Sequence, residues 1–223
     1  MKGKINEVFS SIQGEGLYLG ARQLFVRFYG CNLQCRFCDT KIDSFIEYEP
    51  EELFAEIKLY GKNFHSLAFT GGEPLLQKDF LKEVLRSAKG GRYRIYLETN
   101  ATLPAGLEAV IEYVDIVAMD IKLPTSTGLS GFWQAHGEFL KIASKKEVFI
   151  KTVISSLTTQ EDLEQALNLL YKVNRSSILV LQPDGNEELG ALEEKLESFK
   201  NLCRGRKITA CVIPQMQKIV GVR

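Results

Sequence analysis

The sequence predicts an α/β fold in which about six parallel strands form a partial, open barrel of the TIM type. Short runs rich in β-branched and aromatic residues alternate with longer segments of helical periodicity, which is the pattern of successive βα units. Polar or glycine residues follow the expected strands, at the end of a parallel sheet where ligands bind. The 223 residues are few for the eight βα units of a complete barrel.

The expected strands are short apolar runs that end in polar or turn-forming residues. RQLFVRFY at 22–29 and YRIYLE at 93–98 combine aromatic and branched side chains, and EVFIKTV at 147–153 continues the same pattern. Strands are expected at 22–29, 66–70, 93–98, 115–120, 147–153 and 177–182, with a seventh near 207–213.

Helices are expected between these strands, and two of them have clear start signals. Pro50 suits a helix entry, and Glu51 and Glu52 favour its positive dipole end. Thr158 or Thr159 can cap the segment TTQEDLEQALNLLYKV, which has acids in its first turn. Helices are expected near 50–60, 77–88, 105–112, 131–144, 159–173 and 187–203.

Composition and charge indicate an ordinary globular chain with a packed core, since 45% of the residues are hydrophobic and 25% are charged. Lys+Arg and Asp+Glu both number 28, so no net field suggests a nucleic acid or a membrane as partner. The segment MKGKINEVFSSIQGEG lacks the apolar region of a secretory signal, and no apolar run reaches the roughly 18 residues that span a bilayer. We therefore expect a cytoplasmic protein. No linker or repeat divides residues 1–223, so one domain is expected.

Three of the five cysteines lie in CNLQCRFCDT at 31–40, as Cys31, Cys35 and Cys38. In a reducing cytosol such spacing indicates a metal or redox site. Structural zinc takes four ligands, yet His65 and His136 lie in no zinc-type motif and are expected at the surface or in loops. A [4Fe–4S] cluster has one thiolate per iron, so three thiolates leave one iron open to another ligand. Catalytic zinc with three protein ligands is the alternative. The two other cysteines are expected to be buried small hydrophobic residues: Cys203 and Cys211.

This C-x3-C-x2-C loop, with Phe37 before its third cysteine, resembles the radical S-adenosylmethionine enzymes, and TGGEP at 70–74 follows in the order of that family. The resemblance implies one radical S-adenosylmethionine domain over 1–223, with a [4Fe–4S] cluster on the loop 31–40. S-adenosylmethionine would bind the open iron, and an electron from the cluster would cleave it to a 5'-deoxyadenosyl radical that abstracts hydrogen from the substrate. No further catalytic residue is implied. The implied S-adenosylmethionine contacts are Phe37, Cys38, Asp39, Gly72, Glu73, Glu98, Asn100, Asp120, Ile121, Lys122 and Gln182.

The longer stretch INEVFSSIQGEGLYLGARQLFVRFYGCNLQCRFCDT is similar to the N-terminal half of the 7-carboxy-7-deazaguanine synthases, and FTGGEP, LETN and LVLQP extend the similarity over most of the chain. The resemblance implies conversion of 6-carboxy-5,6,7,8-tetrahydropterin to 7-carboxy-7-deazaguanine, by radical ring contraction with loss of ammonia, in the biosynthesis of queuosine and other 7-deazapurines. The implied substrate contacts are Ile12, Gln13, Gly14, Glu15, Arg27 and Thr70.

The chemistry of these residues suits a carboxylated pterin. Arg27 shares a strand face with Phe25 and Tyr29, and its guanidinium could pair bidentately with the substrate carboxylate. Gln13 and Glu15 suit the amide and amino edge of the pterin ring. Without the resemblance, Arg27 could equally be an exposed strand arginine, and QGEG a glycine-rich loop.

Thr40, at the end of the cysteine loop, is implied by the resemblance to bind Mg²⁺ together with the substrate, and magnesium takes few protein ligands. The alternative is a loop threonine that caps local backbone; Asp39 is not assigned as a metal ligand. The resemblance also implies an electron donor such as flavodoxin and a homodimer. One departure is visible: the family often has Gln-x-His near its C-terminus, whereas PQMQKIVGVR has Gln217 at that position.

Two other functions are compatible with the cysteine loop. A glycyl-radical-enzyme activating protein would use the same cluster on a protein substrate, but would lack the pairing of QGEG with a strand arginine. A non-catalytic iron–sulfur or zinc binding module would leave TGGEP and the polar strand ends without a role.

Overall fold

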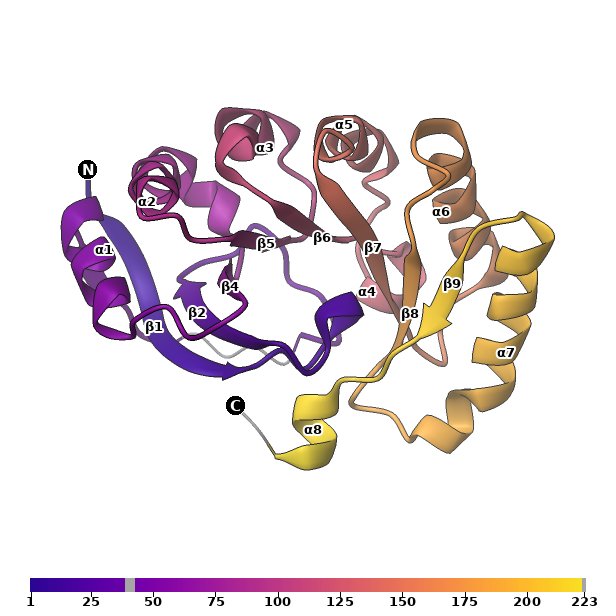
Figure 1. Ribbon diagram of the computed structural model, residues 1–223. Helices are drawn as coiled ribbons and strands as arrows, with labels where there is room; N and C mark the ends of the chain where they lie inside the picture. Colours follow the sequence, from indigo (N-terminus) through magenta and orange to yellow (C-terminus); the bar gives the residue numbers. More distant parts are fainter. Residues whose placement is uncertain (39–42, 222–223) are drawn as a thin grey trace.

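The computed structural model describes residues 1–38 and 43–221, and in this part of the chain nine strands form one curved sheet (Figure 1). The order across the sheet is β3-β1-β2-β4-β5-β6-β7-β8-β9. Neighbours from β2 to β9 are parallel, whereas β1 pairs antiparallel with both β2 and β3. The expected α/β fold with an open, mostly parallel sheet is confirmed. The strands are β1 Gly3–Ile12, β2 Arg22–Phe28, β3 Ile46–Tyr48, β4 Ser66–Gly71, β5 Ile95–Thr99, β6 Ile116–Asp120, β7 Glu147–Ile154, β8 Leu179–Pro183 and β9 Ala210–Val212.

Strands β1 and β3 were not expected, and the segment near 207–213 is strand β9, so the described residues contain seven parallel strands (β2 and β4–β9) rather than six. In β1 the register shifts between Ile5 and Glu7. Ile5 consequently packs in the core under the helices, whereas Glu7 lines the pocket described below. This bulge breaks the alternation of apolar and polar residues, so β1 has no clear strand pattern in the sequence.

The six expected helices are present within a few residues of the predicted bounds and cover the outer side of the sheet (Figure 1). Thr159 caps α6 by accepting the Asp162 N–H, and Pro50 begins α1 as expected. Helices α4 and α8 were missed because four or five residues are too few to show periodicity. The helices are α1 Pro50–Leu59, α2 Lys78–Gly90, α3 Pro104–Val110, α4 Pro124–Thr127, α5 Trp133–Ala143, α6 Gln160–Val173, α7 Leu189–Gly205 and α8 Met216–Val220, with short 3-10 turns at Gly16–Tyr18, Pro74–Gln77 and Ile111–Tyr113.

The inner face of the sheet changes from apolar to polar along the strand direction. A small inner core, which includes Tyr96, Phe149 and Val180, fills the base of the partial barrel. Because side chains alternate between faces, the next inward position on each strand lies two residues further on, toward the carboxyl end. The successive inward pairs are Phe25 and Arg27, Ala68 and Thr70, Tyr96 and Glu98, Ala118 and Asp120, Phe149 and Lys151, and Val180 and Gln182. The sheet therefore carries a layer of polar groups directly above an apolar floor.

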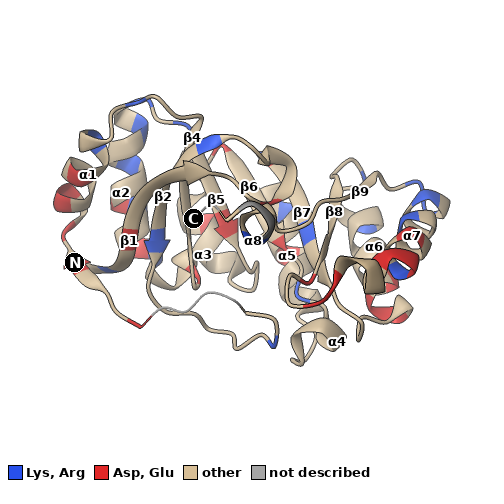
Figure 2. Cartoon of the chain, turned by 90° about the horizontal axis from the view of Figure 1, so that it is seen from below, with Lys and Arg blue, Asp and Glu red and all other residues tan. Residues whose placement is uncertain are grey.

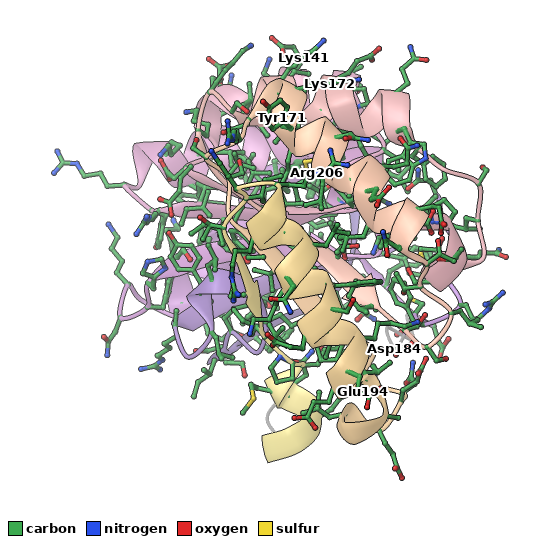
Figure 3. All side chains as sticks on the ribbon, turned by 90° about the vertical axis from the view of Figure 1, so that its right-hand side faces the viewer. Lys141, Tyr171, Lys172, Asp184, Glu194 and Arg206 are labelled. Carbon is green, nitrogen blue, oxygen red and sulfur yellow. The ribbon has the colours of Figure 1, made fainter. Side chains whose placement is uncertain are left out.

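Charged residues of both signs are interspersed over the molecule, and helix α7 carries both (Figure 2). Figure 3 labels Glu194 of α7 and Asp184, which follows β8, toward the lower end of the view, and Arg206, which caps the C-terminus of α7, above them. No helix in the described residues is long and apolar enough to cross a membrane.

Candidate active site

A pocket of about 810 Å³ lies at the carboxyl ends of the parallel strands, where the inner face has become polar. This size is within the range of small-molecule sites. One side of the pocket is formed by the cysteine loop after β2, and the other by the QGEG loop between β1 and β2. The strand ends of β4 to β8 form the wall between them. A ligand in this pocket would touch both loops.

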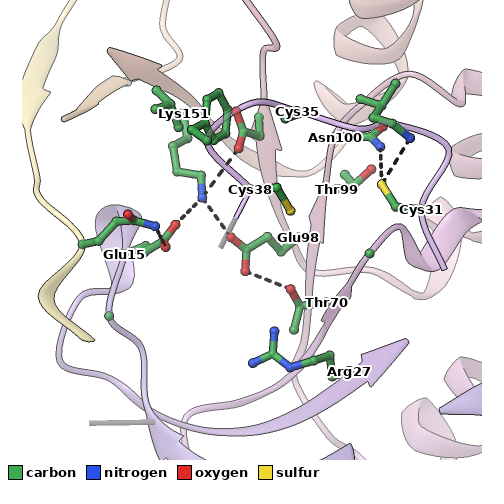
Figure 4. A pocket seen from close by; sticks show the side chains of 18 of the residues that line it. Glu15, Arg27, Cys31, Cys35, Cys38, Thr70, Glu98, Thr99, Asn100 and Lys151 are labelled. Carbon is green, nitrogen blue, oxygen red and sulfur yellow. Dashed lines mark hydrogen bonds and ion pairs between the residues drawn. The ribbon is translucent and has the colours of Figure 1, made fainter. Parts of the chain in front are cut away.

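Cys31, Cys35 and Cys38 all line the pocket, on a loop anchored to α4 by a hydrogen bond from Arg36 N–H to the Thr127 carbonyl. The Cys31 sulfur accepts hydrogen bonds from the Leu33 N–H at 3.4 Å and from the side-chain amide of Asn100 at 3.8 Å (Figure 4). Such donors favour a thiolate. Burial raises the pKa of Cys31 and of Cys35, so binding a metal there would displace protons.

The donor set fits an iron–sulfur cluster better than a single metal ion. Three thiols reach one pocket, as a cluster with one open iron requires. In residues 1–38 and 43–221, no three Cys, His, Asp or Glu side chains are grouped closely enough to hold one ion, which speaks against a preformed zinc site. A cluster takes each thiolate on a different iron and so needs its sulfurs further apart.

Next to the cysteines, the end of strand β4 requires glycine at two positions. A Cβ on Gly72 would lie 2.0 Å from the Gly30 carbonyl oxygen, and one on Gly71 would lie 2.3 Å from the Phe28 oxygen. Gly71 also has a φ of +135°, a conformation that other residues rarely adopt. These glycines let β4 pack directly against the start of the cysteine loop, so both segments face the same ligand.

The side chain of Glu73, a residue expected among the S-adenosylmethionine contacts, does not line the pocket. The side chain is fully buried and accepts hydrogen bonds from the Leu75 N–H, the Asn100 N–H and the Thr99 hydroxyl at 2.8 to 3.0 Å. Its acceptor sites are occupied by the chain itself. Glu73 therefore holds the loop after β5, and through it Asn100, in place.

Burial raises the pKa of Glu73 from its usual 4.5 to about 7, despite these hydrogen bonds. A carboxyl whose pKa is raised in the folded state binds protons that the unfolded state has lost, so stability decreases as pH rises between these two values. We compare the free energy of unfolding of the wild type with that of Glu73→Gln. The wild-type value, relative to that of the variant, is expected to fall by roughly 3 kcal/mol between pH 4 and pH 7.5. Urea unfolding of both proteins across this range measures it, and parallel stability curves would contradict it.

Buried polar atoms at the ends of β6 and β8 point to a polar ligand beside the cysteines. Asp120 Oδ1 and Gln182 Oε1 are buried and have no hydrogen-bond partner in the described residues. The Lys122 ammonium lies 2.8 Å from Asp120 Oδ2 and 5.1 Å from the centre of the Phe37 ring. Buried acceptors without partners are costly, so donors such as the hydroxyl and amino groups of S-adenosylmethionine fit here. The Ile121 side chain packs in the outer core and does not line the pocket, because it points to the opposite face of the sheet.

Arg27 points into the other half of the pocket (Figure 4), as its strand position predicted. Its Nε lies 2.8 Å from Glu7 Oε1, and its guanidinium carbon lies 5.4 Å from the centre of the Phe9 ring. Phe9 stacks on Phe25 with ring centres 5.1 Å apart. The ion pair with Glu7 uses the Nε of Arg27. The two terminal nitrogens of the Arg27 guanidinium are suited to a ligand carboxylate.

Glu15, Lys151 and Glu98 form a chain of charges across the middle of the pocket (Figure 4). The Lys151 ammonium contacts Glu15 Oε2 directly and lies 3.1 Å from Glu98 Oε1, while the Thr70 hydroxyl donates to Glu98 Oε2 at 3.3 Å. Burial would raise the pKa of Glu15, but Lys151 and two glutamine amides lower it to about 2. Burial likewise disfavours the charge on Lys151, but its carboxylate neighbours raise its pKa well above the usual value.

The C-terminal segment closes the pocket against the QGEG loop. The side-chain amides of Gln215 and Gln217 donate to Glu15 Oε1 at 2.8 and 2.6 Å, and the Met216 N–H donates to the Gly14 carbonyl. A Cβ on Gly14 would lie 2.1 Å from Gln217 Oε1, so glycine is required for this approach. Gln217, at the expected position of a Gln-x-His segment, thus contacts the QGEG loop.

His136 corrects an expectation, since it is buried in α5 rather than exposed or in a loop. Its Nδ1 donates to the Ala101 carbonyl and its Nε2 accepts the Lys122 N–H, both at 3.2 Å. Burial lowers its pKa to about 4, so the ring is neutral. It ties the loops after β5 and β6 together behind the pocket. His65 lies half-buried in the loop before β4, as expected.

Most of the expected site residues line this one pocket, whereas the side chains of Glu73 and Ile121 do not. Asp39 and Thr40 lie outside the described residues. The expected residues that the fold brings together are Ile12, Gln13, Gly14, Glu15, Arg27, Cys31, Cys35, Phe37, Cys38, Thr70, Gly72, Glu98, Asn100, Asp120, Lys122 and Gln182. Glu7, Lys151, Gln215 and Gln217 also line the pocket, although they were not assigned as site residues. Two of them had a signal in the sequence: Lys151 lies at a polar strand end, and Gln217 lies at the expected position of a Gln-x-His segment.

Comparisons with known proteins show which family and fold the chain resembles. The family model of the Radical SAM superfamily matches residues 25–196. The 7-carboxy-7-deazaguanine synthase of Geobacter sulfurreducens is 34% identical over 98% of this chain and 97% of its own length. The enzyme of the same name from Archaeoglobus fulgidus is 31% identical over the full length of both chains. The crystal structure of QueE from Escherichia coli has the same fold, with a TM-score of 0.68 and 22% identity over 95% of this chain and 93% of that chain.

Proposed function

Because the chain belongs to the radical SAM superfamily, and within it to the 7-carboxy-7-deazaguanine synthases, we propose that it converts 6-carboxy-5,6,7,8-tetrahydropterin to 7-carboxy-7-deazaguanine with loss of ammonia. The observation that carries this proposal is that the cysteine loop, Arg27 and Glu15 line one pocket. A radical generated at the cysteines would therefore form beside a ligand held by the arginine and the carboxylate.

In this proposal Cys31, Cys35 and Cys38 hold a [4Fe–4S] cluster, and Asn100 and Asp120 help to hold S-adenosylmethionine beside it. When bound, the cluster supplies the electron that generates the hydrogen-abstracting radical from S-adenosylmethionine. The orphaned acceptors Asp120 Oδ1 and Gln182 Oε1 support this placement, because they need donors from a ligand.

The chain's own groups then bind and orient the pterin. Arg27 pairs with the substrate carboxylate through its terminal nitrogens, and the stacked rings of Phe9 and Phe25 adjoin it. Glu15, held ionised, accepts N–H groups from the amide and amino edge of the ring. The C-terminal segment with Gln215 and Gln217 covers that edge and excludes water from it.

We test this function by supplying 6-carboxytetrahydropterin, S-adenosylmethionine, Mg²⁺ and a reductant to the anaerobic, cluster-replete enzyme. Both 5'-deoxyadenosine and 7-carboxy-7-deazaguanine are expected as products. Reduced enzyme that forms no deazaguanine under these conditions would overturn the proposal. The relatives matched over the full chain do not favour an activating enzyme or a non-catalytic module.

We also propose that Thr40 binds a Mg²⁺ ion shared with the substrate, since magnesium needs few protein ligands when a substrate supplies oxygens. Turnover is expected to fall on chelation of Mg²⁺ in the wild type, while Thr40→Val shows low activity that Mg²⁺ does not restore. Thr209→Val, at an exposed threonine that does not line the pocket, is the matched control. A Thr40→Val enzyme with normal magnesium stimulation contradicts the role. A flavodoxin-like electron donor and a homodimer are further proposals from the family resemblance.

A further inference from the structure

Lys151 occupies the centre of the pocket, between the half with the QGEG loop and the half with the cysteines. Its side chain is only 7% exposed and projects from strand β7 toward three carboxylates. It contacts Glu15 directly, lies 3.1 Å from Glu98 and lies 3.7 Å from Asp120. A buried cation among three acids is expected to organise them, since each acid would otherwise be desolvated without compensation.

The three acids depend on Lys151 to different degrees. Asp120 has a nearer cation, because Lys122 lies 2.8 Å from its Oδ2. Within residues 1–38 and 43–221, no other lysine or arginine forms an ion pair with Glu15 or Glu98. Removing the charge of Lys151 would therefore affect Glu15 and Glu98 more than Asp120.

Glu15 and Glu98 still have acceptor capacity for a ligand. An ionised carboxylate accepts about four hydrogen bonds. Glu15 accepts from Lys151, Gln215 and Gln217, and Glu98 accepts from Lys151 and Thr70. The remaining positions can only accept, so they suit N–H donors and repel carbonyl oxygens.

We propose that Lys151 is a positioning residue that sets substrate specificity: it holds Glu15 and Glu98 together as ionised acceptors, and the pocket thereby selects a ring edge that presents N–H donors. This inference rests on the proposed pterin substrate. The 2-amino-4-oxo edge of a pterin presents adjacent amine and lactam N–H groups. Without the cation, two buried carboxyls that face one lysine would share a proton, and a protonated carboxyl can donate to a carbonyl.

The test compares 6-carboxypterin with 6-carboxylumazine, in which a carbonyl replaces the 2-amino group. Neither compound requires turnover, so binding to the anaerobic holoenzyme with S-adenosylmethionine and Mg²⁺ is measured by equilibrium dialysis. Wild type is expected to prefer the pterin. Lys151→Met is expected to weaken pterin binding by about tenfold or more, and to lose most of the preference over the lumazine. Binding of S-adenosylmethionine should weaken less than binding of the pterin, because Asp120 retains Lys122 and Glu98 retains its hydrogen bond from Thr70.

Two variants separate this role from a purely structural one. Lys151→Arg keeps the charge and is expected to keep the preference for the pterin. Lys145→Met removes an exposed lysine just before strand β7, where it pairs with Glu108. This variant should change neither the affinity for the pterin nor the preference over the lumazine. If Lys151→Met does not fold, the double variant Lys151→Met/Glu98→Gln removes one of the uncompensated acids and is expected to show the same loss of preference.

A Lys151→Met enzyme, or its double variant, with the wild-type preference for the pterin would overturn the inference while leaving the proposed function intact. A wild type that binds the two compounds equally would also overturn it. A wild type that prefers the pterin but forms no deazaguanine from the tetrahydropterin would instead overturn the proposed function, and the role of Lys151 would still be decided by the binding comparison.

Discussion

Replacing Cys35 with alanine is expected to abolish cleavage of S-adenosylmethionine and to remove most of the iron from the protein. The wild type, prepared without air, should be brown and contain about four irons per chain. Cys35 lines the pocket between the two other cysteines of the loop, and a cluster held by two thiolates is expected to be lost. Iron analysis and 5'-deoxyadenosine formation measure the effect.

The fold should survive this change, because the backbone hydrogen bonds that hold the loop do not use the Cys35 side chain. Cys203→Ala is the matched control, since this cysteine lies on the buried face of α7 in the outer core, and its loss should lower stability without lowering iron content. Stoichiometric zinc in place of iron in the anaerobic wild type would contradict the cluster.

Replacing Arg27 with alanine is expected to weaken binding of the pterin substrate by about 10- to 100-fold, the usual cost of losing a hydrogen-bonded charge. Binding of S-adenosylmethionine should stay nearly unchanged, because Arg27 lies on the opposite side of Thr70 and Glu98 from the cysteines (Figure 4). The ratio of the two substrate KM values, or two separate binding titrations, measures the split.

Arg22→Ala is the matched control for Arg27. Arg22 begins the same strand but is exposed and does not line the pocket, so its loss should leave both ligands unaffected. Arg27→Lys should restore binding only in part, because an ammonium cannot form the bidentate pair with a carboxylate. Equal loss of pterin and S-adenosylmethionine binding in Arg27→Ala would contradict the carboxylate role and point to a disrupted strand.

The parallel strands and the longer helices were predictable because each has a local pattern that its burial requires. Strands β4 to β8 are apolar on both faces, and the amphipathic helices cover only their outer side. Strand β1 could not be predicted in this way, because its bulge moves Glu7 to the inner face, and strand β3 has only three residues, two of them exposed. Their place in the sheet depends on pairing with other strands: β1 pairs with β2, and β3 pairs with β1, which lies distant from it in the sequence.

Short sequence motifs predicted most of the residues that line the pocket. The cysteine spacing, the QGEG loop and Arg27 carried the family resemblance that implied the reaction. Glu73 shows the limit of that approach. The sequence does not show that the Glu73 carboxylate is turned away from the pocket, because the residues that bind it, Thr99 and Asn100, are separated from it by 26 and 27 residues.

The sequence by itself determined which groups this protein has for radical chemistry, because cluster ligands and glycine turns are set by spacing within a few residues. Only the tertiary structure decided which charges meet. Glu15 comes from the loop after β1, Glu98 from β5, Lys151 from β7 and Gln217 from α8, and they meet because a closing sheet brings its strand ends around one space. The physical reason is the distance along the chain over which each property is set. Backbone conformation is selected by neighbours in the sequence, whereas the protonation of a buried charged group is set by partners that come near it only after folding.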